Sequence, residues 1–340
     1  MALALGVLDQ SPIREGGTPA QALAESVALA QACERFGYGR YWLAEHHNAS
    51  GLACTAPEIL IGRIASATER LRVGAGGVML SHYSSLKVAE TFGMLEALFP
   101  GRIDLGLGRA PGSDGLTSHA LSPIQGQLAG SDQYPRQVAD LLGYLHGGLE
   151  DGHPFASVTP QPVPDSPPQV WLLGSSDQSA LLAAHFGCPF SFAHFLSGQG
   201  GDRVMAEYIR NFRASPFAAT PQGSICVFVL CAETDAEAER LAASRSLWRL
   251  RVEETGTIQP FPSPETALAE TYSESQRARI ARNRAREVVG TPDRVKAALE
   301  DLARRYGVNE VIILTIAYEF ADRVKSYELV AKAFGLKPAF

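Results

Sequence analysis

The chain has 340 residues, of which 46% are hydrophobic and 19% charged, a balance typical of a soluble globular protein with a large core. Thirty Lys and Arg against 36 Asp and Glu give a formal net charge of −6, which argues against a protein that neutralises many nucleic-acid phosphates. No apolar run approaches the roughly 20 residues that span a bilayer, and the five cysteines never form a C-x-x-C pair. We therefore expect a cytoplasmic protein that binds neither nucleic acid nor membrane.

Short apolar runs recur along the chain, each directly after a glycine that ends an amphipathic segment, which is the pattern of a helix followed by a buried strand. The predicted strands cover residues 3–8, 40–44, 71–78, 103–108, 170–174, 189–194, 225–231 and 310–315. The predicted helices cover residues 18–36, 56–68, 84–98, 134–146, 177–186, 201–213, 235–250, 292–305 and 322–334.

Eight buried strands that alternate with helices favour an α/β fold closed into a TIM (β/α)8 barrel. The alternative is an open doubly wound sheet. Its nucleotide-binding fingerprint is missing, because Pro111 stands where the third glycine of G-x-G-x-x-G belongs after Gly106 and Gly108. We expect residues 1–340 to form one barrel domain.

Three segments interrupt the alternation and are predicted to be insertions on the catalytic face: 110–133, 147–168 and 251–291. The third ends in an arginine-rich run, 277–286, for which a solvated helical face and an anion-facing lid are equally favoured.

Polar residues follow the predicted strands where each one ends, which in a parallel barrel is the catalytic end. Glu45, His46 and His47 come directly after the second strand. Because a strand alternates its faces, one histidine can point into the barrel mouth and act as a general acid or base while its neighbour points into the wall. Two structural histidines are the alternative. A metal site is not predicted, because the first strand ends in Asp9 and Gln10 rather than in His-x-His.

The segment after the fifth strand, Gly174-Ser175-Ser176-Asp-Gln-Ser179, leads into a helix whose first turn exposes unpaired amides. Helix N-termini attract anions, and Arg109 follows a neighbouring strand. This arrangement predicts a phosphate site for a phosphorylated cofactor, although simple N-capping by serine is the alternative.

Six motifs in matching order resemble the bacterial luciferase-like, flavin-dependent monooxygenases, closest to their uncharacterised single-chain branch. The motifs are Asp9-Gln-Ser-Pro12, Trp42-Leu-Ala-Glu-His-His47, Leu71-Arg-Val-Gly-Ala-Gly-Gly-Val-Met-Leu80, Arg102-Ile-Asp-Leu-Gly-Leu-Gly-Arg109, Phe192-Ala-His-Phe195 and Val289-Gly-Thr-Pro-Asp293.

The resemblance implies a TIM barrel that binds FMN at the carboxyl ends of its strands. Reduced FMN would take up O2 as a C4a-hydroperoxide and oxygenate a small organic substrate. His46 matches the family's catalytic histidine, and we group Glu45 and His47 with it. The remaining matches concern the cofactor: Arg109, Ser175, Ser176 and Ser179 for the phosphate, and a cis peptide between Gly76 and Gly77 under the flavin ring. Gly174 and His194 are also expected to bind the cofactor.

Three departures argue against light emission and a long-chain aldehyde substrate. The light-emitting members have cysteine where this chain has Gly108, glutamate where it has Ser175 and tryptophan where it has His194. No nicotinamide fingerprint is found, so a separate flavin reductase is expected, and the resemblance implies a homodimer. The alternatives are a non-catalytic flavin-binding protein and an F420-dependent oxidoreductase on the same barrel.

Overall fold

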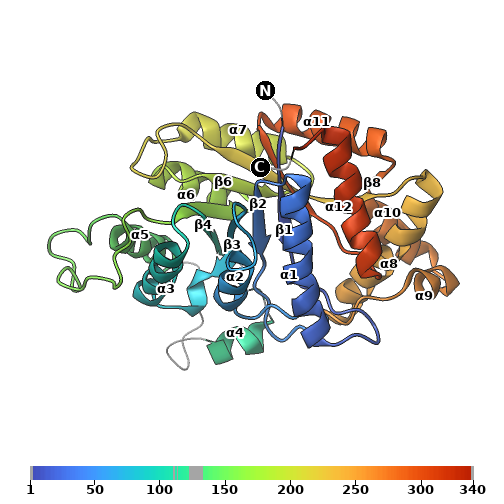
Figure 1. The fold of residues 1–340 in the computed structure, drawn as a ribbon, viewed down its shortest axis with the longest axis horizontal. Coiled ribbons are helices and arrows are strands. Elements are labelled where there is room, and N and C mark those ends of the chain that lie inside the picture. The colour runs from blue at the N-terminus through green and yellow to red at the C-terminus, as the bar shows by residue number, and fades with distance from the viewer. Residues whose placement is uncertain (1–2, 110–111, 113, 122–132, 338–340) are drawn as a thin grey trace.

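Eight parallel strands form a closed ring in the computed structural model, which describes residues 3–109, 112, 114–121 and 133–337 (Figure 1). Each strand pairs with the next along the chain, and β9 closes the ring by pairing with both β7 and β1. The ring strands are β1 (Ala4–Asp9), β2 (Arg40–Leu43), β3 (Arg72–Met79), β4 (Ile103–Gly108), β5 (Gln169–Gly174), β6 (Phe190–Ala193), β7 (Gly223–Cys231) and β9 (Glu310–Leu314). The predicted TIM barrel is confirmed, and every predicted strand is present.

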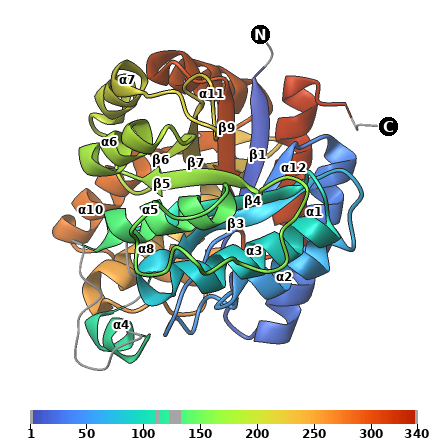
Figure 2. The same ribbon diagram turned by 90° about the vertical axis from the view of Figure 1, so that its left-hand side faces the viewer.

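Helices cover the outside of the ring, and Figure 2 shows α2, α3 and α5 side by side on one flank. All nine predicted helices are present: α1 (Pro19–Phe36), α2 (Pro57–Ala65), α3 (Ser85–Leu98), α5 (Tyr134–Leu145), α6 (Asp177–Phe186), α7 (Gly201–Asn211), α8 (Asp235–Thr255), α11 (Pro292–Tyr306) and α12 (Phe320–Phe334). Gly37 and Gly307 end α1 and α11 with φ of 94° and 65°, a conformation that glycine adopts without strain. Within the described residues, no helix is both long enough and apolar enough to cross a membrane.

The interior of the barrel is filled by large side chains from several strands. Leu8, Trp42, Trp171, Phe228 and Ile312 belong to one buried cluster, separate from the larger core between strands and helices. The two tryptophan rings pack edge to face with their centroids 5.4 Å apart. The interior of the barrel is therefore a packed core and not a pore.

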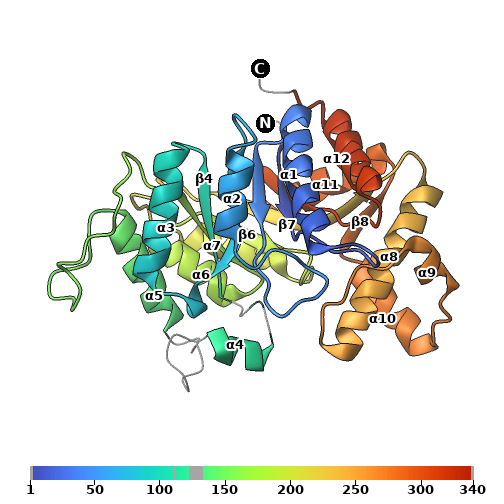
Figure 3. The ribbon, with the colours of Figure 1, turned by 60° about the horizontal axis from the view of Figure 1, so that its bottom comes forward.

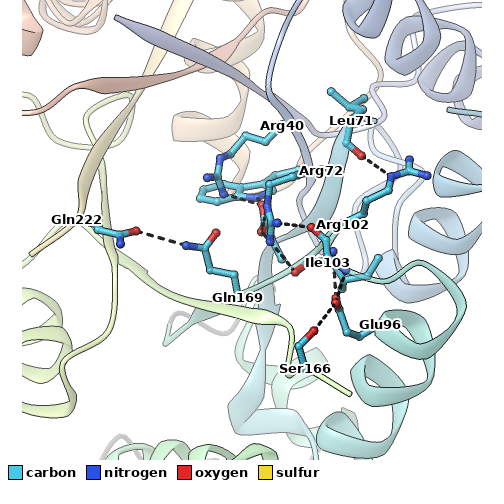
Figure 4. A network of polar contacts seen from close by, with 12 residues as sticks. Arg40, Leu71, Arg72, Glu96, Arg102, Ile103, Ser166, Gln169 and Gln222 are labelled. Carbon is cyan, nitrogen blue, oxygen red and sulfur yellow. Dashed lines mark hydrogen bonds and ion pairs between the residues drawn. The ribbon is translucent and has the colours of Figure 1, made fainter. Parts of the chain in front are cut away.

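The amino-terminal end of the barrel is closed by a network of charges (Figure 4). Asp104 is fully buried and accepts hydrogen bonds from Arg40 Nη1 at 2.6 Å, Arg72 Nη2 at 2.6 Å and Trp42 Nε1 at 2.9 Å. Arg40 Nε also donates to Glu310 at 2.6 Å, and its guanidinium lies 4.7 Å from the Trp171 ring centroid. Asp104 and Glu310 therefore each have an arginine partner.

The predicted insertions contain more regular structure than the sequence indicated (Figure 3). Segment 110–133 contains α4 (Gly115–Leu121), and residues 110–111, 113 and 122–132 lie outside the described part of the chain. Segment 147–168 forms turns without a helix or strand. Segment 251–291 contains the end of α8, which continues to Thr255, followed by α9 (Pro264–Ala269), α10 (Glu274–Arg284) and β8 (Glu287–Gly290).

Local capping explains these extra helices. Ser263 and Ser273 accept hydrogen bonds from the amides three residues ahead and so begin α9 and α10. Three arginines of the run 277–286 form ion pairs with carboxylates of α8, as a helical face does and a lid over an anion would not. The pairs are Arg279–Glu254, Arg282–Glu253 and Arg284–Glu239.

Candidate active site

A cavity of about 440 Å³ lies at the carboxyl ends of the strands, where this architecture places its chemistry. Segments that follow most of the ring strands contribute to its wall. Eight of the eleven predicted site residues line it: His46, Gly76, Gly77, Arg109, Gly174, Ser175, Ser176 and Ser179. Glu45, His47 and His194 lie outside the lining.

His46 is held at the cavity by its backbone, whose amide donates to the carbonyl of Cys54 at 3.0 Å. Burial lowers the pKa of the imidazole from 6.5 to about 4, so the ring is neutral at pH 7. Its Nδ1 is buried and has no hydrogen-bond partner among the described residues. A neutral imidazole that borders the cavity can accept a proton from a bound molecule.

Glu45 and His47 face the wall behind His46. The Glu45 carboxylate is buried and accepts hydrogen bonds from Tyr83 Oη at 2.6 Å and Met79 N at 3.0 Å. His47 Nε2 lies 2.7 Å from the same carboxylate. Glu45 therefore ties the end of β2 to the end of β3, and its catalytic assignment remains a prediction.

The glycine pair of β3 gives the cavity a wall without side chains. The Gly76–Gly77 peptide is cis. A Cβ on Gly76 would come within 2.8 Å of Leu8 and 2.9 Å of Trp42, and one on Gly77 within 2.6 Å of the Gly106 carbonyl oxygen. Close packing of the barrel thus requires glycine at both positions.

The amino end of α6 brings polar groups to the cavity beside this wall. Ser176 caps the helix by accepting a hydrogen bond from Ser179 N at 3.4 Å, and the two hydroxyl oxygens are 3.2 Å apart. A Cβ on Gly174 would lie 2.4 Å from Ser179 Oγ, so only glycine fits there. Arg109 comes from the end of β4 and donates to Gln178 in the first turn of α6. The hydroxyls of Ser176 and Ser179, the first amides of α6 and the guanidinium of Arg109 are therefore grouped around the first turn of α6.

His194 follows β6 and its Nδ1 lies 2.8 Å from the hydroxyl of Tyr306. Burial, with Arg305 and Arg286 nearby, lowers the pKa of His194 to about 4. Its side chain is 6% exposed and is absent from the cavity lining, so its assignment to the cofactor remains a prediction.

Sequence reasoning missed one wall of the cavity, which α8 provides. Arg245, Trp248, Arg249 and Val252 line the cavity at a spacing of three, one and three residues, one face of a helix. This helical spacing is the sequence signal that could have located the wall. In the described part of the chain, no three His, Cys, Asp or Glu side chains are grouped so as to hold a metal ion.

The model of the luciferase-like monooxygenase family matches residues 3–310. The chain belongs to the luciferase-like monooxygenase family. The protein is accordingly an oxidoreductase, and the enzyme class inferred from the six motifs is confirmed.

Relatives of this luciferase-like monooxygenase match over nearly the whole chain. The uncharacterized protein YwcH of Bacillus subtilis is 47% identical over 98% of this chain and 99% of its own. The N-acetyl-S-alkylcysteine monooxygenase of the same organism is 36% identical over 97% of each chain. The crystal structure of apo-MsnO8 has a TM-score of 0.88 and 38% identity, with 99% of each chain covered.

More distant solved structures have the same fold and different cofactors. The oxygenating constituent of 3,6-diketocamphane monooxygenase from Pseudomonas putida, in complex with FMN, matches with a TM-score of 0.71, 18% identity and 98% coverage of each chain. An F420-dependent secondary alcohol dehydrogenase in complex with an F420-acetone adduct matches with a TM-score of 0.70, 13% identity and coverage of 98% and 99%. At these identities the likeness shows the fold alone.

Proposed function

We propose that this luciferase-like monooxygenase uses reduced FMN and O2 to oxygenate a small organic substrate. The observation that carries the proposal is that one cavity contains both an anion cradle, at the amino end of α6, and the neutral histidine His46. The cradle suits a phosphorylated cofactor, and the histidine suits proton transfer beside it.

The donors of the cradle fit a phosphate monoester. Ser176 Oγ and Ser179 Oγ lie 3.2 Å apart, and Arg109 already reaches the first turn of α6 through Gln178. A guanidinium that exchanges Gln178 for phosphate oxygens gains charge-assisted hydrogen bonds. Gly174 keeps the approach free of a side chain. We infer that Arg109, Ser175, Ser176 and Ser179 hold the phosphate.

The wall of Gly76 and Gly77 fits a planar ring, since it offers the cavity backbone atoms next to the apolar side chains of Leu8, Trp42 and Leu173. Bound FMN would supply the activation of O2, which no amino-acid side chain provides. The barrel would orient the substrate against this ring and keep bulk water away.

His46 is the residue that would move a proton. Its pKa of about 4 keeps the ring neutral at pH 7, so it can take up a proton from the substrate or from water and return it later. Glu45 and His47 act as positioning residues in this scheme, because the Glu45 carboxylate fixes Met79 and Tyr83 around the same turn.

The test uses the purified protein with a flavin reductase. We expect equilibrium dialysis to show FMN binding, and mass spectrometry to show transfer of one 18O atom from 18O2 to a thioether such as N-acetyl-S-methylcysteine. Thioethers are the first panel because a relative is named for N-acetyl-S-alkylcysteines. FMN binding with no labelled product from any panel substrate would identify a non-catalytic flavin protein. Binding of F420 and not FMN would overturn the proposal.

We also propose that the protein is a homodimer that receives reduced flavin from a separate reductase. Apolar side chains on the outer surfaces of α2 and α3 support the dimer: Ile59, Met94 and Leu98 are 74%, 53% and 63% exposed. Exposed apolar groups of this size on neighbouring helices are typical of an interface. Light scattering after gel filtration tests it, and a mass of one chain would contradict it.

A further inference from the structure

The wall that α8 contributes to the cavity carries positive charge that the cofactor site does not use. Arg245 and Arg249 line the cavity one helical turn apart, with Trp248 between them. The indole nitrogen of Trp248 donates to the carbonyl of Gln259 at 2.8 Å, which fixes this stretch of helix against the following loop. Both guanidinium groups therefore lie on a rigid element.

Arg245 is 3% exposed and only partly satisfied. Its Nε donates to Glu287 at 2.8 Å, and its guanidinium carbon lies 3.8 Å from the centroid of Phe228. Its Nη1 is buried and has no hydrogen-bond partner among the described residues. Arg284 Nη1 also lies 3.3 Å from Glu287 Oε2, so two arginines share the single negative charge of Glu287. The Arg245 side chain also borders the cavity, where a bound anion can supply further acceptors to its guanidinium.

Arg249 forms no hydrogen bond or ion pair that involves the described residues, although it lies half-buried in the same wall. Burial and the charge of Arg286 lower the pKa of Arg249, and the carboxylates of Glu253 and Glu287 only partly offset them. Two guanidinium groups that both lack a full complement of acceptors thus face one region of the cavity.

The remainder of the lining gives this region its chemical character. The described lining contains three arginines and no aspartate or glutamate. Arg109 belongs to the strand end of β4 and contacts α6, whereas Arg245 and Arg249 lie on α8 after β7. Because β6 separates β5 from β7 in the ring, the cavity has two positive regions on different sides. Around the second one stand the apolar side chains of Phe195, Val252 and Ile258.

We propose that Arg245 and Arg249 bind the carboxylate of the substrate, so that this enzyme acts on small carboxylic acids whose remaining part is apolar. The inference rests on the proposed function, since it assigns the second positive region to the substrate and leaves the Arg109 cradle to the cofactor. A planar guanidinium matches a carboxylate with two parallel hydrogen bonds, and a second guanidinium accounts for the remaining lone pairs.

The experiment compares two probes of the same shape, 4-phenylbutyrate and 4-phenylbutanamide, by calorimetric titration into the protein with and without saturating oxidised FMN. We expect the carboxylate to bind at least about tenfold more tightly than the amide, with FMN present or absent. In Arg249→Gln, which changes a half-buried side chain and spares the buried Arg245, this preference should disappear. FMN affinity should stay as in the unaltered protein.

The matched control is Arg251→Gln on the same helix, because Arg251 pairs with Glu15 and Glu270 and does not line the cavity. It should keep the preference for the carboxylate. Equal binding of both probes by the unaltered protein would overturn the proposal, as would competition between 4-phenylbutyrate and FMN. Loss of FMN binding in Arg249→Gln would assign the arginines to the cofactor phosphate. Failure of FMN to bind the unaltered protein would instead count against the proposed function.

Discussion

The amino-terminal end of the barrel and the cavity at its carboxyl end differ in how completely their charged side chains are paired. At the amino-terminal end, Asp104 and Glu310 accept hydrogen bonds from Arg40 or Arg72 at distances between 2.6 and 2.9 Å. At the carboxyl end, Arg245 keeps an unpaired nitrogen, Arg249 has no partner among the described residues, and His46 is held neutral. Ion pairs close the amino-terminal end of the barrel. The incompletely paired arginines at the cavity are the groups to which we propose that a ligand binds.

The largest expected effect is on the paired end. Asp104→Ala should lower the free energy of unfolding by about 3–5 kcal/mol, because it leaves Arg40 and Arg72 without their shared carboxylate. Urea unfolding followed by circular dichroism measures this. The control is Asp301→Ala, which removes a half-exposed pair with Arg304 and should cost less than about 1 kcal/mol. Similar losses for both variants would mean that the network does not close the barrel.

At the unpaired end, His46→Gln should lower turnover by about 10²–10⁴-fold, the contribution of a positioned acid or base. The unfolding free energy should change far less than in Asp104→Ala, because His46 forms no ion pair with the described residues and glutamine retains a polar side chain there. Initial rates of labelled product formation provide the measurement. His119→Gln, on the exposed surface of α4, should keep full turnover. Normal rates in His46→Gln would remove His46 from the mechanism.

His194 offers a test through pH, because it is buried at the carboxyl end but paired with Tyr306. Its pKa falls from 6.5 to about 4 on folding, so the unfolded chain takes up a proton first as pH decreases. Neutral His194 therefore contributes about 3 kcal/mol to the free energy of unfolding above pH 6.5, and this contribution is lost as the pH falls from 6.5 to 4. His194→Phe should flatten the fall in unfolding free energy across this range. An unchanged slope would show that His194 titrates normally.

The smallest effect concerns the cofactor cradle. Arg109→Ala should weaken FMN binding by about 10–100-fold, as expected for the loss of one charge-assisted contact. Fluorescence titration of FMN measures the dissociation constant. Arg136→Ala, which changes an exposed arginine of α5, should leave it unchanged. An equal effect of both variants would indicate general electrostatic attraction rather than a cradle.

Local patterns were sufficient to predict the barrel. Glycine-ended helices followed by apolar runs located every ring strand, and the polar residues after those strands located His46 and the serines of α6. Both signals come from short stretches of sequence. An apolar run indicates a buried strand, and the residues directly after it lie at the carboxyl end of that strand.

Contacts between distant segments could not be read in this way. Arg245 resembles a surface residue of a charged helix, and only the docking of α8 against β7 and β8 buries it. The Arg40 and Asp104 pair joins residues 64 positions apart, which no spacing rule anticipates. The burial of His194 likewise depends on Tyr306, 112 positions away. Tertiary packing decides these cases and local propensity does not.

The short strand β8 has a consequence for how the substrate wall can change during evolution. It pairs with β7 between Phe228 and Cys231, beyond the stretch that β6 pairs, while β9 closes the ring with β7 and β1. Closure of the barrel is therefore independent of the segment from α8 to β8. Mutations can therefore remodel the segment from α8 to β8, which carries the proposed carboxylate site, without altering the strand ends of the proposed cofactor site.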